Sequence, residues 1–236
     1  QVTSDASGPN GLFRATATIS AGDADRYQRA GRLPLELAGP SGERRRSEGH
    51  AQLVGARGVS VISDIDDTVK ISNVRDRRAL MANTFLNPFE AIPGMARAYA
   101  AWAEGGAVFH YISSSPWQLY SALSQFFAES GLPAGSFHLR EIGLGDRSFL
   151  DLFDTPADAK VPTIAEIIRR WPQRRFVLVV DSGEQAPEIY ARIYREFPGN
   201  VLHIFIRNVT DEGDAAPRHR EVFADVPRER WTVFTD

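Results

Sequence analysis

The sequence predicts an α/β fold, with a parallel sheet that carries helices on both faces and is preceded by a small β-unit. Two observations predict it. From Val59 onward, short apolar runs rich in β-branched residues alternate with segments whose apolar residues recur at helical spacing. Before that point the chain shows only short candidate strands with Gly- and Pro-containing breaks. We therefore expect a β-rich unit over residues 1–57 and an α/β domain over residues 58–236.

Composition and charge are those of an ordinary globular protein, and they exclude several classes of function. The net charge of −3 gives no general attraction to nucleic acid, so we expect no nucleic-acid partner. Cysteine is absent, which excludes disulfides, thiolate metal sites and cysteine nucleophiles. No apolar run approaches the roughly 20 residues of a membrane span, so we expect a soluble or peripheral protein, and a monomer. The chain starts at Gln1, and a removed signal peptide would imply export, so the compartment stays open.

The predicted β-unit contains three short strands, over residues 12–19, 33–37 and 50–54. Residues 39–46 contain Gly, Pro and Ser followed by an arginine cluster, and they predict a hairpin loop between the last two strands. Residues 1–10 are polar and interrupted by Gly and Pro, which predicts a flexible terminus.

The predicted α/β domain alternates strands with helices that carry one apolar face. The expected strands cover residues 59–62, 107–112, 175–180 and 201–206, and the expected helices cover residues 94–104, 117–129, 162–171 and 186–197. Ser115 suits the N-cap and Pro116 the first position of the second helix. The tail is expected to be irregular from Asp211, with Trp231 and Phe234 folding it back onto the domain.

Three aspartates, Asp64, Asp66 and Asp67, directly follow the first strand of the α/β domain, and Thr68 comes next. Several ionised carboxylates at the end of a buried strand are costly unless a counter-charge lies beside them. A hard divalent cation such as Mg²⁺ prefers carboxylate oxygens. The pattern therefore predicts a metal-assisted site at the carboxyl end of this strand.

Other strand ends supply further polar residues. Ser113 follows the second strand, Asp181 follows the third, and Lys160 precedes a helix. The carboxyl ends of parallel strands meet at one edge of a sheet, so we expect these side chains to converge there. Lysine occurs only at Lys70 and Lys160, and all the other basic residues apart from histidine are arginines. This usage suggests that these two positions, and Lys160 above all, need a compact ammonium group.

Each of these residues has an expected chemical role. Asp64 is the candidate nucleophile, and Asp66 would protonate the leaving oxygen and later activate water. Asp64 and Asp181 would hold Mg²⁺, with Asp66 as a further candidate ligand. Lys160 would neutralise a phosphoryl oxygen as charge develops.

Five residues near the strand ends have weaker expectations. Thr68, Ser113 and Ser114 are candidate substrate-binding residues, Ser113 together with the N–H groups at the start of the following helix. Asp67 is expected to cap the turn after the nucleophile. Arg207 is either an anion ligand or one partner of a surface ion pair.

The order and spacing DxDxT, serine, lysine and strand-end aspartate resembles the haloacid dehalogenase superfamily of phosphohydrolases. More narrowly, SDIDDTVKIS, YISSSPWQLY and DSGEQAPEIY resemble the actin-patch phosphatidate phosphatase family and its bacterial relatives, over residues 58–207. The resemblance implies a Rossmann-like sheet and a Mg²⁺-dependent phosphatase with an aspartate nucleophile. It also implies phosphatidate, or a related lipid phosphate, as the substrate class.

The chain departs from that family's usual pattern at three positions. Ala159 stands where a histidine precedes the lysine, Val180 where a glycine precedes the aspartate, and Ala186 where a second acid follows. A lost carboxylate removes a metal ligand or a partner of one, although Glu184 lies close enough in the chain to compensate. Two alternatives therefore stay open: a phosphatase for a soluble phosphomonoester, and a catalytically degenerate member that binds lipid or phosphate.

Residues 73–92 lie between the candidate nucleophile and the first helix of the domain. The segment mixes arginines with large apolar residues, among them Phe85 and Phe89. One hypothesis is a short lid whose apolar side meets acyl chains or a membrane surface, which implies peripheral membrane contact. The alternative is that these residues pack the segment onto the domain.

Overall fold

The computed structural model describes residues 8, 15–29, 31–38, 46–73, 76–85, 87–141 and 159–235. The chain divides into two compact units, residues 1–55 with 143–145 and residues 56–142 with 146–236.

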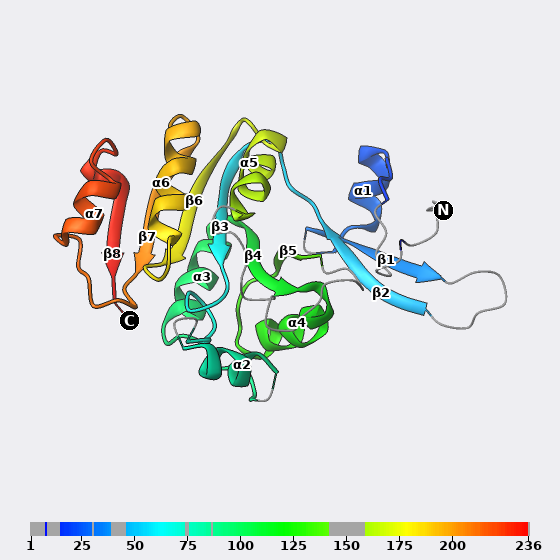
Figure 1. Cartoon of the computed structure of the whole chain (residues 1–236). Helices are drawn as coiled ribbons and strands as arrows, with labels where there is room; N and C mark the ends of the chain where they lie inside the picture. The colour runs from blue at the N-terminus through cyan, green and yellow to red at the C-terminus, as the bar shows by residue number, and fades with distance from the viewer. Residues whose placement is uncertain are drawn as a thin grey trace. The chain divides into compact units, whose positions relative to one another are not determined.

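The first unit contains a short helix and a β-hairpin (Figure 1). The elements are α1 (Ala21–Tyr27), β1 (Arg32–Ala38) and β2 (Arg46–Gln52), with β1 and β2 antiparallel. The predicted hairpin is confirmed, although its second strand begins before residue 50. The predicted strand over residues 12–19 is wrong for residues 15–19, which are not in a strand, because Ser20 caps a helix directly afterwards. Residues 12–14, most of the predicted loop over residues 39–46 and most of residues 1–10 lie outside the described residues.

The second unit is built on a sheet of parallel strands, which confirms the predicted fold class. The strand order is β5-β4-β3-β6-β7-β8, and every neighbouring pair is parallel. The strands are β3 (Gly58–Asp64), β4 (Val108–Pro116), β5 (Gly135–Arg140), β6 (Arg174–Asp181), β7 (Val201–Arg207) and β8 (Trp231–Phe234).

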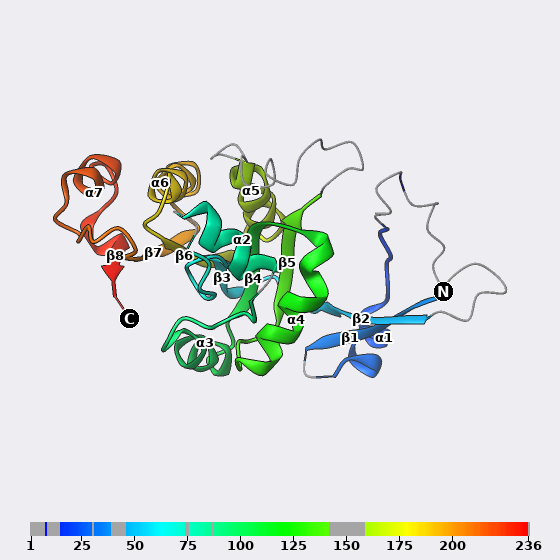
Figure 2. The ribbon, with the colours of Figure 1, turned by 60° about the horizontal axis from the view of Figure 1, so that its bottom comes forward.

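Helices cover both faces of this sheet, as Figure 2 shows. The helices are α2 (Arg77–Phe85), α3 (Met95–Glu104), α4 (Tyr120–Glu129), α5 (Lys160–Arg170), α6 (Ala186–Glu196) and α7 (Pro217–Val222). Side chains alternate across a strand, so Ile62 packs with α5, α6 and α7 on one face, whereas Val61 packs with α3 and α4 on the other. None of the helices in the described part of the chain is long and apolar enough to cross a membrane.

The turn between β4 and α4 differs from the prediction. Ser115 belongs to β4, and Pro116 occupies the cap position of a 3₁₀ turn (Trp117–Leu119) without a side-chain cap. The predicted N-cap role of Ser115 is therefore wrong. The reason is that β4 continues past Ile112 through an irregular register with β5.

Two strands of the second unit have weak sequence signals. The edge strand β5 alternates polar and apolar residues around Phe137 and Leu139, and β8 is only four residues long. The tail is thus not irregular throughout, because β8 forms the outer strand of the sheet. Its Trp231 and Phe234 do fold back onto the domain, where each packs against a different face of the sheet.

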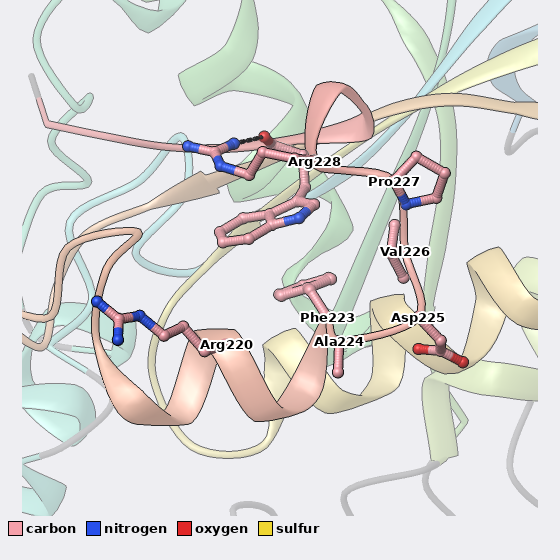
Figure 3. Close-up of a pocket in the computed structure, with 8 residues that line it drawn as sticks. Arg220, Phe223, Ala224, Asp225, Val226, Pro227 and Arg228 are labelled. Atoms are coloured by element: carbon pink, nitrogen blue, oxygen red, sulfur yellow. Dashed lines mark hydrogen bonds between the residues drawn. The ribbon is translucent and has the colours of Figure 1, made fainter.

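The tail also forms a hollow of about 500 Å³, seen in Figure 3. Trp231 stacks on Phe223 with ring centroids 4.7 Å apart, and the Arg228 guanidinium lies 4.4 Å from the Trp231 ring. This hollow lies at the amino end of β8. It is therefore at the opposite edge of the sheet from the strand ends that carry the predicted site residues.

The segment 73–92 contains α2, and part of it packs onto the domain. Leu80 is buried, and Phe89 makes an edge-to-face contact with Phe126 at 5.8 Å. The Phe85 side chain lies outside the described residues. Phe89 therefore packs this segment onto the domain, as the alternative to the lid hypothesis expected. The lid itself stays a prediction.

Candidate active site

Three neighbouring strands bring the predicted site residues to the same edge of the sheet. Asp64 ends β3, Asp181 ends β6, and Ser113 lies near the end of β4. Both β4 and β6 pair with β3, with Asp64 opposite Ile112 and Ser63 opposite Val179. The site is therefore centred on β3, and Lys160 reaches it from the first turn of α5.

The chain turns sharply after Asp64. The Ile65 carbonyl accepts the N–H groups of Val69 and Lys70, each at 3.0 Å. Asp67 adopts a left-handed φ of 52°, and its Oδ1 accepts the N–H groups of Ser72 at 2.8 Å and Asn73 at 2.7 Å. The Asp67 carboxylate thus caps the turn, as expected.

Arg207 also supports this turn. Its guanidinium donates to the Asp67 carbonyl at 2.9 Å, which ties the end of β7 to the loop after β3. This bond to the backbone of the turn is an additional role of Arg207, and its two expected roles, anion ligand or partner in an ion pair, stay predictions.

Asp64 is buried and forms an ion pair with Lys160, whose Nζ lies 2.6 Å from its Oδ1. Burial raises the pKa of the Asp64 carboxyl because it disfavours the charged form, and the ammonium of Lys160 offsets part of this effect. For Lys160, burial alone would lower the pKa, but the charge of Asp64 outweighs it and the pKa is raised. A carboxylate and a lysine therefore face each other at the centre of the site.

Asp66 lies among hydrogen-bond donors and a second lysine. Its Oδ1 lies 3.0 Å from Lys70 Nζ and accepts the Ser72 hydroxyl at 2.6 Å, while its Oδ2 accepts the Ser113 hydroxyl at 2.7 Å. Burial would raise the pKa of the Asp66 carboxyl, but Lys70 and the two serines lower it overall. This arrangement stabilises the ionised form of Asp66.

Asp181 is the third buried carboxylate of the site. Burial, together with the nearby charge of Asp64, raises the pKa of Asp181 to about 7. Its Oδ1 accepts the Gly183 N–H at 2.6 Å, so the loop after β6 orients it.

The predicted substrate-binding residues occupy different positions. Thr68 is fully buried, and its hydroxyl has no hydrogen-bond partner among the described residues. Ser113 contacts Asp66, and its hydroxyl also accepts the Ser115 N–H at 2.8 Å. Ser114 is half-buried beside it in β4. Substrate binding by these three residues stays a prediction.

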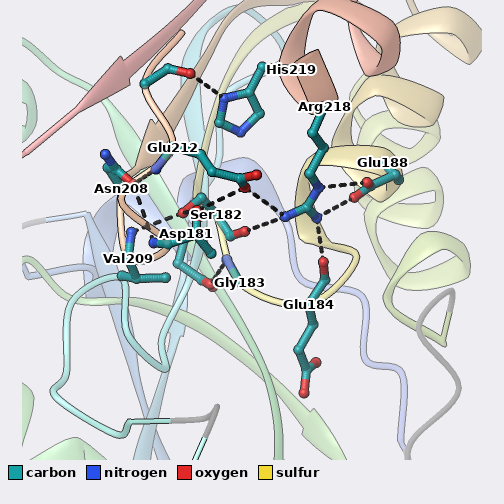
Figure 4. A network of polar contacts seen from close by, with 12 residues as sticks. Asp181, Ser182, Gly183, Glu184, Glu188, Asn208, Val209, Glu212, Arg218 and His219 are labelled. Atoms are coloured by element: carbon teal, nitrogen blue, oxygen red, sulfur yellow. Dashed lines mark hydrogen bonds and ion pairs between the residues drawn. The ribbon is translucent and has the colours of Figure 1, made fainter. Parts of the chain in front are cut away.

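The three departures from the family pattern lie around the same edge. Ala159 is exposed just before Lys160, and Val180 is fully buried in β6. Ala186 begins α6, and the acid in the first turn of that helix is Glu188, which pairs with Arg218. Glu184 is exposed, and in Figure 4 its side chain points away from Asp181.

Sequence reasoning gave little weight to two members of this site. Lys70 is buried, with 1% of its side chain exposed, and it holds Asp66 and Ser72. Its rarity in the sequence was the available signal, since Lys70 and Lys160 are the only lysines and both pair with site aspartates. Ser72 carried no comparable signal.

The donors at this edge fit a magnesium ion that takes part of its shell from water or substrate. Among the described residues there is no cluster of three or more His, Cys, Asp or Glu arranged to hold a metal. Mg²⁺, however, is commonly bound by one or two carboxylates, waters and substrate phosphates. Asp64 and Asp181 are two buried carboxylates close enough for their charges to interact. Both oxygens of Asp66 accept hydrogen bonds, and its role as a ligand stays a prediction.

Fold and site together define an α/β protein with an aspartate- and lysine-containing site at the carboxyl edge of a parallel sheet. The model of the family described as Phosphatidate phosphatase APP1, catalytic domain, matches residues 59–208, and the chain belongs to this family. The family resemblance of the sequence motifs is thereby confirmed.

Two yeast proteins are similar to this chain. Phosphatidate phosphatase APP1 of Saccharomyces cerevisiae is 33% identical over 175 residues, and an uncharacterized protein of Schizosaccharomyces pombe is 35% identical over 159 residues. The alignments cover 72% and 66% of this chain, but 29% and 26% of the two yeast proteins.

A solved structure, that of the Pnkp1/Rnl/Hen1 complex, contains a chain with a TM-score of 0.44 and 15% identity. The match covers 65% of this chain and 47% of that one. A similarity of this size supports no inference about function.

Proposed function

We propose that this chain hydrolyses phosphomonoesters with the help of Mg²⁺, through an aspartyl-phosphate on Asp64, and that its substrate is phosphatidate or a related lipid phosphate. The observation that carries the proposal is the ion pair between the buried Asp64 and Lys160, beside Asp66 at the carboxyl edge of the sheet. Membership of a family described by a phosphatidate phosphatase supports the substrate class. The alignments span less than a third of each yeast protein, so the substrate is carried over as a proposal.

The first chemical step forms a bond between an Asp64 oxygen and phosphorus and breaks the bond to the alcohol oxygen. In the resting site Lys160 holds Asp64 at 2.6 Å. The same ammonium can then donate to a phosphoryl oxygen as negative charge builds up there. When bound by Asp64 and Asp181, Mg²⁺ would offset the charge of the phosphoryl group.

Proton transfer falls to Asp66. It would give a proton to the leaving alcohol oxygen, and take one from the water that attacks the phosphorus and releases phosphate from Asp64. The resting environment favours ionised Asp66, which suits the second step. A doubly charged phosphate beside it would raise the pKa of Asp66, and this effect supplies the protonated form that the first step needs.

In the main alternative the fold is the same but the catalytic activity is weak or absent. Ala186 in place of an acid at the start of α6 favours a catalytically weak member that binds phosphate or lipid. A phosphatase for a soluble phosphomonoester differs from the main proposal in substrate alone.

The test measures phosphate release from phosphatidate vesicles and from p-nitrophenyl phosphate, each with Mg²⁺ and with EDTA. We expect Mg²⁺-dependent release from both, and a loss on the order of 10⁴-fold or more in Asp64→Asn because the nucleophile is removed. Asp67→Asn is the matched control, since its amide oxygen can still accept the N–H groups of Ser72 and Asn73.

Each outcome separates the candidates. Unchanged release in Asp64→Asn contradicts the mechanism. Release from the aryl ester alone favours a soluble substrate. No release from either ester, together with binding to phosphatidate vesicles, favours the phosphate- or lipid-binding alternative.

A further inference from the structure

The loop after β6 holds Asp181 in a bent backbone. Gly183 donates its N–H to Asp181 Oδ1, and Glu184 adopts a left-handed φ of 45°, which residues with a side chain rarely adopt. Ser182 is fully buried, and its hydroxyl accepts the Val209 N–H at 2.9 Å. A loop of this kind needs contacts from outside to keep its shape.

Arg218 provides such contacts from the start of α7, as Figure 4 shows. Its Nη1 donates to the Ser182 carbonyl at 2.9 Å, and its Nη2 donates to the Glu184 carbonyl. These two carbonyls lie on either side of Gly183, the residue that orients the Asp181 carboxylate. One guanidinium thus bridges the bend.

The same guanidinium is anchored to α6. Its Nε and Nη2 donate to the two oxygens of Glu188 at 2.9 and 2.8 Å, in the first turn of that helix. Glu212 lies 3.6 Å from Nη1 and accepts the Thr210 hydroxyl, which in turn contacts the Ser182 hydroxyl at 2.9 Å. The planar fork of an arginine can serve two carbonyls and a carboxylate at once, whereas a lysine ammonium cannot reproduce this geometry.

We propose that Arg218 is a positioning residue for Asp181: it fixes the Ser182–Glu184 backbone and, through Gly183, the direction of the carboxylate toward the cation. The proposal rests on the proposed function for the assignment of Asp181 as a metal ligand. The family match ends at residue 208. Arg218 therefore supports the Asp181 loop from outside the matched region.

The experiment uses the full chain with Arg218→Lys, Arg218→Met and Glu188→Gln. The control is Arg195→Met, which breaks another arginine–carboxylate contact, between α6 and Asp225 in the segment that follows α7. Arg195 donates to both oxygens of Asp225 and to the Val222 carbonyl, and none of these groups belongs to the loop after β6. Mg²⁺ affinity is measured by calorimetry, and amide exchange at Gly183 is measured by NMR.

We expect both Arg218 variants to weaken Mg²⁺ binding by about 10- to 100-fold, the range found for groups that orient metal ligands. Gly183 exchange should be at least ten times faster. Glu188→Gln should show a smaller change in the same direction, and it serves as the test if Arg218→Met does not fold. Arg195→Met should leave both quantities within about twofold of wild type.

Two results overturn the proposal or separate it from the metal assignment. If the Arg218 variants lose stability to the same extent as Arg195→Met while Gly183 exchange and Mg²⁺ affinity stay unchanged, Arg218 is a structural residue only. If the wild-type chain binds no Mg²⁺, the metal assignment of the proposed function fails, and amide exchange at Gly183 alone decides the role of Arg218.

Discussion

Two aspartate–lysine pairs lie side by side in the candidate site, and they differ in almost every physical respect. Asp64 pairs with Lys160, which lies 96 positions later in the sequence. The Lys160 side chain is 22% exposed. Asp66 pairs with Lys70 four positions away, and Lys70 is 1% exposed. The first pair joins two elements at the open edge, whereas the second lies inside a local turn.

The electrostatic result is opposite in the two pairs. The pKa of Asp64 is raised, mainly by burial, whereas that of Asp66 is lowered because Lys70, Ser72 and Ser113 outweigh burial. Two carboxylates separated by one residue therefore have different protonation behaviour. In the resting site these directions are the reverse of what the proposed roles need, because a nucleophile must be ionised and a proton donor must be protonated. A cation held beside Asp64 would lower its pKa, and a phosphate beside Asp66 would raise its pKa, so both shifts would favour the required forms.

After the loss of the nucleophile, the largest expected effect tests the proton-transfer role. Asp66→Asn should lower phosphate release from phosphatidate by about 10²- to 10⁴-fold, because the alcohol leaves without a proton donor. With p-nitrophenyl phosphate the leaving group needs no proton. We therefore expect a burst of nitrophenol followed by slow turnover, measured by stopped-flow absorbance. An equal loss on both esters without a burst would contradict the assignment.

The next effect separates the two lysines. Lys160→Met should lower kcat by about 10²- to 10³-fold, since it removes a charge from the reacting centre. Lys70→Met leaves Asp66 without its buried counter-charge and should lower the free energy of unfolding by about 3–5 kcal/mol. Urea unfolding with and without Mg²⁺ measures the second effect.

Magnesium distinguishes the lysine variants further. It should restore part of the stability of Lys160→Met, where the ion can neutralise Asp64, and little of that of Lys70→Met. Equal rescue of both variants would show that the two pairs share one electrostatic environment.

The smallest expected effect is the pH dependence of stability without metal. Asp181 has a folded pKa of about 7, above its ordinary value of 3.8, so its contribution is present below about pH 4 and is lost as the pH rises toward 7. Asp66 has a lowered pKa, so its contribution is present above about pH 4 and is lost as the pH falls.

Two variants measure these opposite slopes. Relative to wild type, Asp181→Asn should become progressively more stable between pH 4 and 7, by at most about 1.4 kcal/mol per pH unit. The free energy of unfolding of Asp66→Asn should be closest to that of wild type at the lowest pH. Urea unfolding in EDTA from pH 3 to 8 gives the free energy of unfolding of each variant as a function of pH. If the two variants show the same pH dependence relative to wild type, the opposite pKa shifts of Asp181 and Asp66 are contradicted.

The parallel sheet and the residues at its strand ends could be predicted from the sequence, because both depend on strong local signals. Apolar runs identify β3, β4, β6 and β7, and parallel strands bring their carboxyl ends to one edge whatever the details of packing. Asp64, Ser113 and Asp181 meet for that reason. Lys160 could be selected because it is one of two lysines.

The remaining parts depend on tertiary contacts that leave little trace in sequence. Whether Lys70 points to Asp66 is decided by a turn in which Asp67 is left-handed. Arg218 is one of many arginines, and only the fold shows that it meets the loop of Asp181. The strand β8 is short, and its place at the sheet edge follows from pairing with β7 rather than from its own pattern.

The two lysines also give the protein an unusual pattern of chemical reactivity. Apart from the terminal amine, Lys70 and Lys160 carry its only primary amines, and Lys70 is almost completely covered. An amine-directed reagent therefore has a single partly exposed side-chain target, at the centre of the site. The rate of modification at Lys160 would report directly how often its ion pair with Asp64 opens, and a bound phosphate ester would protect it.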